Sequence, residues 1–148
     1  MITIIVGAGF AGSGLTKRLL YQGEDVRVII FGSRTMPFSA FPLIDLAVQK
    51  SGYQVTEVVC GMSKGADTLG GKWAYDRGIP IARFPADWEN LGKRAGNARN
   101  RQMGDYADAG IGFIWAGSRG SEHMRNYLEY LGKPHFIVYN GELDYALS

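Results

Sequence analysis

Two glycine-rich segments and an Arg-Asn pair between them hold the residues best suited to chemistry in this sequence. The first segment is Gly61 to Asp67 (GMSKGAD), the second is Gly117 to Ser121 (GSRGS), and Arg99-Asn100 lies between them. Each segment follows an apolar run and precedes a helical pattern. Glycine lets the backbone approach a ligand, and a helix N-terminus offers unpaired N–H groups and a positive dipole. Together they predict a socket for a phosphorylated ligand.

Further candidates lie after other apolar runs. Ser33 and Arg34 follow one of them, where a hydroxyl and a two-pronged guanidinium could reach phosphate, although a surface turn with a solvated arginine is the alternative. Asp67 could hold ribose hydroxyls or orient a basic partner, or it could simply stabilise a helix start. Trp88 could stack on a base, and Asp87 could accept a hydrogen bond from a ribose hydroxyl or an amine. The alternative is that Trp88 is an aromatic residue at the rim that covers the hydrophobic core.

The stretch 91–101 is the most basic in the chain, with four basic residues and no acid. Arg99 is its main candidate for contact with an anion, and a solvated helix face is the alternative. The complete set of predicted ligand contacts is Gly32, Ser33, Arg34, Gly61, Gly65, Asp67, Asp87, Trp88, Arg99, Asn100, Gly117, Ser118, Gly120 and Ser121.

Apolar runs that suit strands alternate with helical patterns along the whole chain. The expected strands are 2–6, 26–31, 55–60, 79–84, 111–115 and 135–139, and the expected helices are 11–21, 41–50, 66–77, 95–107 and 120–131. The strand runs are continuously apolar, as in parallel sheets covered on both faces. The pattern predicts a single α/β domain, Rossmann-like and doubly wound, with a mostly parallel sheet and helices on both faces.

Composition fits a globular protein: of 148 residues, 46% are hydrophobic and 20% charged, with a net charge of +2. The single cysteine, Cys60, excludes an internal disulfide and suits a buried position. The two histidines, His123 and His135, lie in different elements, so no metal site is expected. No apolar stretch approaches the ~20 residues of a membrane span. The sequence shows no secretory leader, and we expect a cytoplasmic protein without membrane contact.

Residues 4–12 (IIVGAGFAG) form a G-x-G-x-x-G motif and resemble the opening of flavin- and nicotinamide-binding Rossmann domains. Dinucleotide recognition also requires an acidic residue at the end of the next strand. Gly32-Ser33-Arg34 stand there instead, so we predict no cofactor. We interpret residues 1–25 as an additional N-terminal βα unit, in which the glycine turn packs the chain or contacts phosphate.

From Val26 to about residue 140 the chain resembles the YspA-like branch of the SLOG superfamily, which is related to LOG-type nucleotide phosphoribohydrolases and to DNA-processing protein A. The resemblance rests on an ordered set of motifs: Gly32-Ser33-Arg34, Gly61…Gly65-Ala66-Asp67, Trp73-Ala74, Phe84-Pro85-Ala86-Asp87-Trp88, Ala95-Gly96, Arg99-Asn100…Met103, Ala107-Asp108 and Gly117-Ser118-Arg119-Gly120-Ser121. It implies a SLOG-like core over 26–140. In LOG-type enzymes a similar arginine takes part in N-glycosidic cleavage, and Arg99 matches it. Their catalytic glutamate corresponds to Met124, and this departure argues against LOG-type hydrolysis.

Three functions follow as hypotheses. The first is binding of a nucleotide-derived small molecule, as a sensor or sequestering protein. The second is cleavage or transfer at a nucleotide N-glycosidic bond, with Arg99 as the cation and Asp67, Asp87 or Glu122 as the carboxylate. The third is single-stranded DNA binding, as in DNA-processing protein A. The resemblance also implies a homo-oligomer.

Overall fold

The computed structural model describes residues 26–142 of the chain. The strand expected at 2–6, the helix expected at 11–21 and the G-x-G-x-x-G motif therefore lie outside the described residues. The described elements are, in chain order, β1 (Arg27–Gly32), the 3-10 helix η1 (Phe38–Ala40), α2 (Pro42–Ser51), β2 (Glu57–Cys60), α3 (Ala66–Asp76), β3 (Ile81–Arg83), α4 (Trp88–Leu91), the 3-10 helix η2 (Gly92–Arg94), α5 (Ala95–Tyr106), β4 (Ala109–Ile114), α6 (Arg119–Leu131) and β5 (His135–Tyr139).

The five described strands form one sheet in the order β3-β2-β1-β4-β5. Every neighbouring pair in it is parallel. All six residues of β4 are buried, as the continuous apolar runs predict for a strand covered on both faces. The prediction of a Rossmann-like α/β domain with a doubly wound sheet is confirmed.

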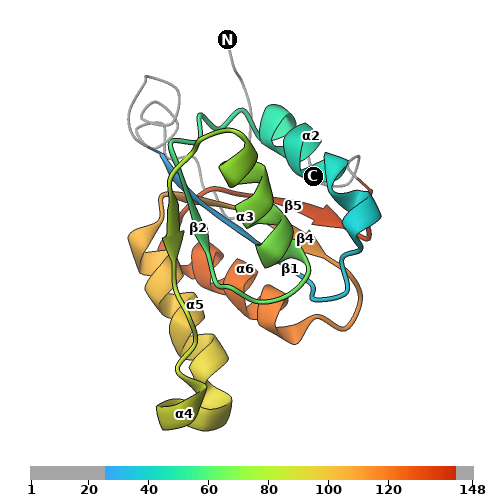
Figure 1. The fold of residues 1–148 in the computed structure, drawn as a ribbon. Helices are drawn as coiled ribbons and strands as arrows, with labels where there is room; N and C mark the ends of the chain where they lie inside the picture. The colour runs from blue at the N-terminus through green and yellow to red at the C-terminus, as the bar shows by residue number, and fades with distance from the viewer. Residues whose placement is uncertain (1–25, 143–148) are drawn as a thin grey trace.

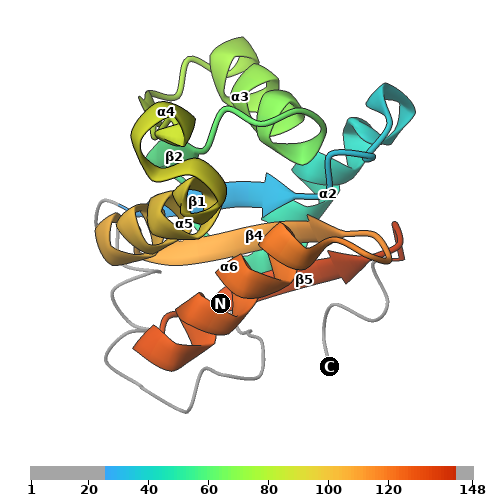
Figure 2. The same ribbon diagram turned by 90° about the horizontal axis from the view of Figure 1, so that it is seen from below.

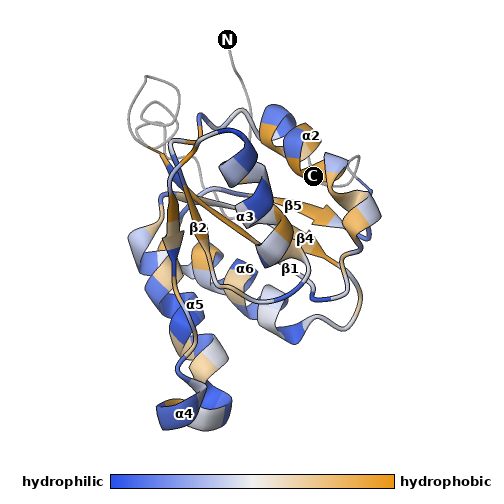
Figure 3. Cartoon of the chain, in the orientation of Figure 1, coloured by the Kyte–Doolittle hydropathy of each residue, from blue (hydrophilic) through white to orange (hydrophobic). Residues whose placement is uncertain are grey.

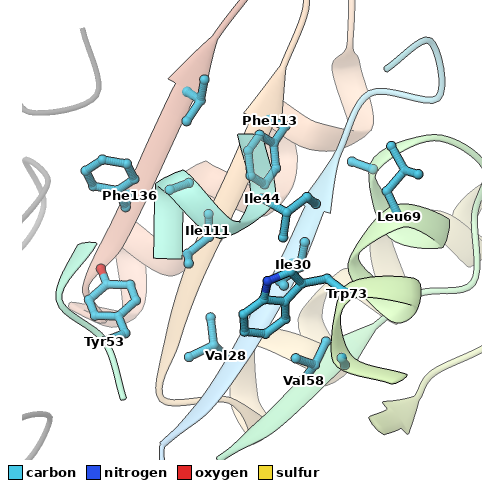
Figure 4. Packing of buried hydrophobic residues seen from close by; sticks show 14 of the residues in the cluster. Val28, Ile30, Ile44, Tyr53, Val58, Leu69, Trp73, Ile111, Phe113 and Phe136 are labelled. Atoms are coloured by element: carbon cyan, nitrogen blue, oxygen red, sulfur yellow. The ribbon is translucent and has the colours of Figure 1, made fainter. Parts of the chain in front are cut away.

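Helices cover both faces of the sheet (Figures 1 and 2). On one face, α2 and α3 pack Ile44, Leu69 and Trp73 against alternate strand residues such as Val28 and Ile30, as Figure 4 shows. The other face carries a second core, built by α5 and α6 against the remaining strand residues: Ile29, Phe31, Val59, Ile114 and Ile137 from the strands and Met103, Met124 and Leu128 from the helices. Successive residues of each strand thus serve opposite layers.

Hydropathy follows these layers, with apolar strands at the centre and polar residues over much of α4 and α5 (Figure 3). The segment from Trp88 to Arg94, which we did not predict as helical, forms α4 and η2. It carries α5 outward from the end of β3 (Figure 1). Within residues 26–142, no helix is long and apolar enough to cross a membrane.

The sheet order contains one topological switch point. The chain proceeds from β1 to β2 and β3 on one side, then crosses back to β4 and β5 on the other. The loops that follow β1 and β4 therefore diverge, and in open α/β sheets the crevice between two such loops is where ligands bind. This crevice is the site described next.

Candidate functional site

A cavity of about 420 Å³ opens at the switch point, beyond the carboxyl ends of β1 and β4. Its wall combines the loop after β1, the loop after β4, the first turns of α3 and α6, and one side of α5. Eleven of the predicted contacts line it: Gly32, Ser33, Arg34, Asp67, Trp88, Arg99, Asn100, Gly117, Ser118, Gly120 and Ser121. We call this space the main cavity.

The loop after β2 lies directly on the loop after β1, and Gly65 makes this contact possible. Its φ is +71°, a conformation that side chains rarely adopt. A Cβ there would also lie 2.7 Å from the carbonyl carbon of Arg34. The Ser33 carbonyl accepts hydrogen bonds from the backbone N–H groups of Met36 and Ala66, each at 3.2 Å. Backbone contacts therefore fix where Arg34 leaves the loop.

The Ser33 hydroxyl serves the fold in addition to lining the main cavity. It is 2% exposed and accepts a 2.8 Å hydrogen bond from the backbone N–H of Trp115. The backbone N–H of Ser33 donates to the Phe113 carbonyl at 2.9 Å. These bonds tie the end of β1 to the end of β4 and set the width of the crevice.

Arg99 is buried, and its donors are largely engaged within the protein. Its guanidinium donates to the carbonyl of Gly61 and, at 3.4 Å each, to the Phe84 carbonyl and the Ser63 hydroxyl. Its Nε donates to Asn100 at 3.3 Å. Burial lowers the pKa of Arg99 from its ordinary value. Arg99 therefore links the ends of β2 and β3 to α5, and it brings a positive charge to the cavity floor.

Asp67 lies close to this cation, in the first turn of α3, with 5% of its surface exposed. Its Oδ2 accepts a 3.2 Å hydrogen bond from the backbone N–H of Ser63. Burial raises the pKa of Asp67 to about 6, against the opposing effect of backbone donors and of the charge on Arg99. The cavity thus contains a carboxyl group that gains its proton near neutral pH.

The loop after β4 presents Gly117, Ser118 and the start of α6. Gly117 has a φ of +83°, which favours glycine, and no atom lies within 4 Å of its missing Cβ. The Ser118 hydroxyl donates to that of Ser121 at 2.6 Å. Asn100 joins α5 to this loop by donating to the Gly120 carbonyl at 3.0 Å. The loop is therefore held in place while its backbone faces open space.

The rim of the main cavity carries the accessible cations and an aromatic ring. Arg34, Lys93 and Arg119 are exposed and line the cavity from three separate segments. Trp88 is 52% exposed, and its indole lies beside Gly96 of α5, where a Cβ would be 3.5 Å from the ring. These four side chains are the ones that solvent-borne ligands meet first.

Three predicted contacts, Gly61, Gly65 and Asp87, do not line the main cavity. Gly61 lies behind it, where a Cβ would be 2.7 Å from Cζ of Arg99. Asp87 begins α4 and accepts hydrogen bonds from the backbone N–H and the amide of Asn90, at 3.1 Å and 3.0 Å. The glycines thus act through packing, and Asp87 acts as a helix cap.

Several lining residues escaped the sequence analysis, among them Thr35, Ser63, Lys93 and Asn97. Ser63 lies within 61–67, and Lys93 and Asn97 lie within the basic stretch 91–101, so their sequence context was a usable signal. Thr35 directly follows Ser33-Arg34, and its position next to that pair was a weaker signal. Within residues 26–142, no group of three or more His, Cys, Asp or Glu side chains could hold a metal ion.

Residues 26–91, which supply the β1, β2 and β3 side of this site, match the family described as YAcAr: YspA, cpYpsA-related SLOG family. This match covers 66 of the 148 residues, so that part of the chain is similar to SLOG proteins. A solved structure of DNA processing protein A (DprA) from Streptococcus pneumoniae shares the fold of this chain, with a TM-score of 0.59 at 16% identity. The likeness covers 76% of this chain and 50% of the DprA chain, so this chain spans about half the length of that neighbour. No curated protein matches the sequence.

Met124 is the residue that the resemblance to LOG-type enzymes matches with their catalytic glutamate. It is 1% exposed and lines the main cavity. The neighbouring Glu122 and His123 line a different cavity, on the other side of the loop after β4. Asp67 is therefore the carboxylate that the described residues bring to the main cavity.

Proposed function

We propose that the main cavity binds a nucleotide or a nucleotide-derived phosphorylated small molecule, and that the protein acts as a sensor or sequestering protein for it. The observation that carries this proposal is the charge of the cavity wall. Among residues 26–142, four basic side chains line it, Arg34, Lys93, Arg99 and Arg119, against the single carboxylate of Asp67. Its volume of about 420 Å³ falls within the range of small-molecule sites. The match of residues 26–91 to the SLOG family supports a nucleotide-related role in general.

Different residues of the main cavity suit different parts of the ligand. The backbone of the Gly117–Ser121 loop and the guanidinium groups of Arg34 and Arg119 suit phosphate oxygens, which accept bidentate hydrogen bonds from arginine. The exposed indole of Trp88 suits a base, since aromatic rings stack on any base. Arg99 contributes its positive charge from the floor of the main cavity. It does so without direct hydrogen bonds to the ligand, because its guanidinium donates to the Gly61 and Phe84 carbonyls.

Native mass spectrometry with a mixed panel tests this proposal first. The panel holds mononucleotides, NAD, ADP-ribose, cyclic dinucleotides and a short single-stranded oligonucleotide. We expect one nucleotide class to be retained and titration calorimetry to confirm it. Because a charged hydrogen bond contributes about 1.5–3 kcal/mol, Arg34→Gln and Lys93→Gln should each weaken binding about tenfold or more.

Arg94→Gln is the matched control, because Arg94 adjoins Lys93 in η2 and does not line the main cavity. It should leave the affinity within about twofold of the parent protein. Retention of the oligonucleotide alone would favour single-stranded DNA binding instead. Absence of binding to any member of the panel would refute a nucleotide socket.

The environment of Asp67 favours a second candidate function, cleavage at the N-glycosidic bond of the bound nucleotide. A carboxyl group with a pKa of about 6 beside a buried cation can support a developing oxocarbenium centre or exchange a proton with the leaving base. Base release would be followed by chromatography across the nucleotides that bind. Asp67→Asn should abolish release while binding persists, and absence of release from every bound nucleotide would exclude this activity.

A further inference from the structure

A second cavity of about 430 Å³ lies on the far side of the loop after β4. Its floor and walls come from the end of β4, the exposed side of α6 and the turn after β5, so it opens at the same carboxyl edge of the sheet. Of the residues that the structure describes, four line both cavities: Ala116, Gly117, Ser118 and Arg119. The loop after β4 is therefore a shared wall between two spaces of similar size.

The two cavities differ in chemistry. Apart from the shared Arg119, none of the described residues in the wall of the second cavity is a lysine or arginine. It offers the carboxylate of Glu122, the amides of Asn126 and Asn140, the phenol of Tyr139 and the indole of Trp115. Carboxylates, amides and phenols accept or donate hydrogen bonds to hydroxyl groups, and an indole offers an apolar face with a polar edge. Such a wall suits an uncharged, hydroxyl-rich group.

Several of these polar groups are available to a ligand. Among residues 26–142, the Tyr139 hydroxyl and the side chains of Glu122 and Asn140 make no intramolecular hydrogen bond. Asn140 has a φ of +54° and begins the turn that Tyr139 and Glu142 close. Asparagine tolerates this conformation better than most residues, and the turn places it at the rim of the second cavity.

We propose that the second cavity is a sugar subsite, and that the ligand is a nucleoside diphosphate carrying a sugar on its terminal phosphate. This inference rests on the proposed function of the main cavity. The nucleoside and its first phosphate occupy the main cavity, the second phosphate lies along Gly117–Arg119 with Arg119 between the two spaces, and the sugar enters the second cavity. The charged part of the ligand thus meets the basic residues of the main cavity and the shared wall, and the uncharged sugar has a space of its own.

Matched ligand pairs test the subsite, because each pair shares its base and pyrophosphate and differs only in the sugar. We would titrate ADP against ADP-glucose, GDP against GDP-mannose and UDP against UDP-glucose by calorimetry. In the pair with the preferred base, we expect the sugar-bearing member to bind about tenfold more tightly.

Variants on α6 then assign that gain to the second cavity. Asn126 is exposed, so Asn126→Trp should fold and fill the second cavity, abolishing the preference while leaving the affinity for the plain diphosphate unchanged. Glu129→Trp is the matched control, since Glu129 is an exposed residue of the same helix that lines neither cavity. Tyr139→Phe, which adds no volume, should reduce the preference about fivefold.

The outcomes separate the two proposals. Equal affinity within every pair would overturn the sugar subsite while leaving the nucleotide socket standing. A preference that survives Asn126→Trp as fully as Glu129→Trp would also overturn it, because the sugar would then bind elsewhere. Failure of every plain diphosphate and every sugar-bearing partner to bind would overturn both proposals.

Discussion

Arg99 shows how a residue identified for its chemistry can act mainly through position. Its charge and motif mark it as an anion-binding residue, yet its donors reach the Gly61 and Phe84 carbonyls and the Ser63 hydroxyl. Removing a buried charged donor leaves its acceptors unsatisfied, which costs stability as well as function. Arg34 and Arg119, which are exposed at the rim, are therefore better reporters of ligand contact.

Asp67 carries a pH dependence of stability that can be isolated by substitution. Burial raises the pKa of its carboxyl group to about 6 in the folded protein, from an ordinary 3.8. The folded state therefore binds the proton more tightly, and stability from this group is present below pH 3.8 and lost as the pH rises through 6. The free energy of unfolding of the parent protein, minus that of Asp67→Asn, should fall by about 2 kcal/mol between pH 4 and pH 7.

Denaturant unfolding at several pH values measures this difference directly. Glu89→Gln, at an exposed carboxylate of α4, controls for the general effect of removing a negative charge and should give a nearly constant difference. If the Asp67→Asn difference is equally flat, the pKa of Asp67 is not raised by folding.

At the scale of elements, the sequence predicts where strands and long helices lie because periodicity depends on burial. The run from His135 to Tyr139 is a strand with the predicted bounds, and the helices expected at 66–77 and 95–107 are α3 and α5 to within one residue. Short elements carry too little periodicity for this. The turn of α4 and η2 depends on the Asp87 cap and on Gly92, whose φ is +55°.

Side-chain direction was harder to predict than element position. Glycine motifs correctly indicated two strand-to-helix loops, but they did not distinguish glycines that face a ligand from glycines that face the protein. Gly117 faces open space, whereas Gly61 and Gly65 are pressed against Arg99 and Arg34. That difference depends on how loops far apart in sequence pack together, and a single sequence holds no record of it.

Gly65 therefore gives a prediction at the scale of the loop pair. Gly65→Ala combines an unfavourable φ of +71° with a Cβ 2.7 Å from the Arg34 carbonyl carbon. Strain of this kind costs about 1–3 kcal/mol at one residue, before the clash is counted. We expect the free energy of unfolding to fall by about 2 kcal/mol or more, measured by urea denaturation, with weaker nucleotide binding because Arg34 is displaced.

Gly71→Ala is the control for this substitution. Gly71 lies in α3, and no atom lies within 4 Å of its missing Cβ. Alanine at that position should be neutral or stabilising by up to about 1 kcal/mol, because glycine disfavours helix interiors. Equal effects of the two substitutions would mean that the Gly65 contact does not constrain the loops.

At the scale of the whole molecule, topology gathers charge that is dispersed in the sequence. Arg34, Lys93 and Arg119 come from segments separated by parts of the sheet and meet because β1 and β4 are neighbours with diverging loops. The whole chain has 16 basic and 14 acidic residues; without the four basic residues and the one acidic residue that line the main cavity, 12 basic and 13 acidic residues remain and nearly balance. The positive field is therefore expected to be confined to the main cavity at the switch point.

A positive field confined to a cavity and an extended basic groove predict different affinities for single-stranded nucleic acid as the strand lengthens. A protein that tracks a strand neutralises more phosphates as the strand lengthens, and log affinity then falls with log salt by about 0.7 per neutralised phosphate. We expect the affinity for 5′-phosphorylated oligothymidylates to level off after one or two nucleotides, with a salt slope that stays constant with length. Fluorescence anisotropy from the mononucleotide to the octamer, at several salt concentrations, measures both quantities.

A slope that steepens steadily with length would show that phosphates bind beyond the cavities. The nucleotide socket would then be one end of a DNA-binding groove, and Arg94 and Arg101, exposed basic residues outside both cavities, would be the first residues to substitute.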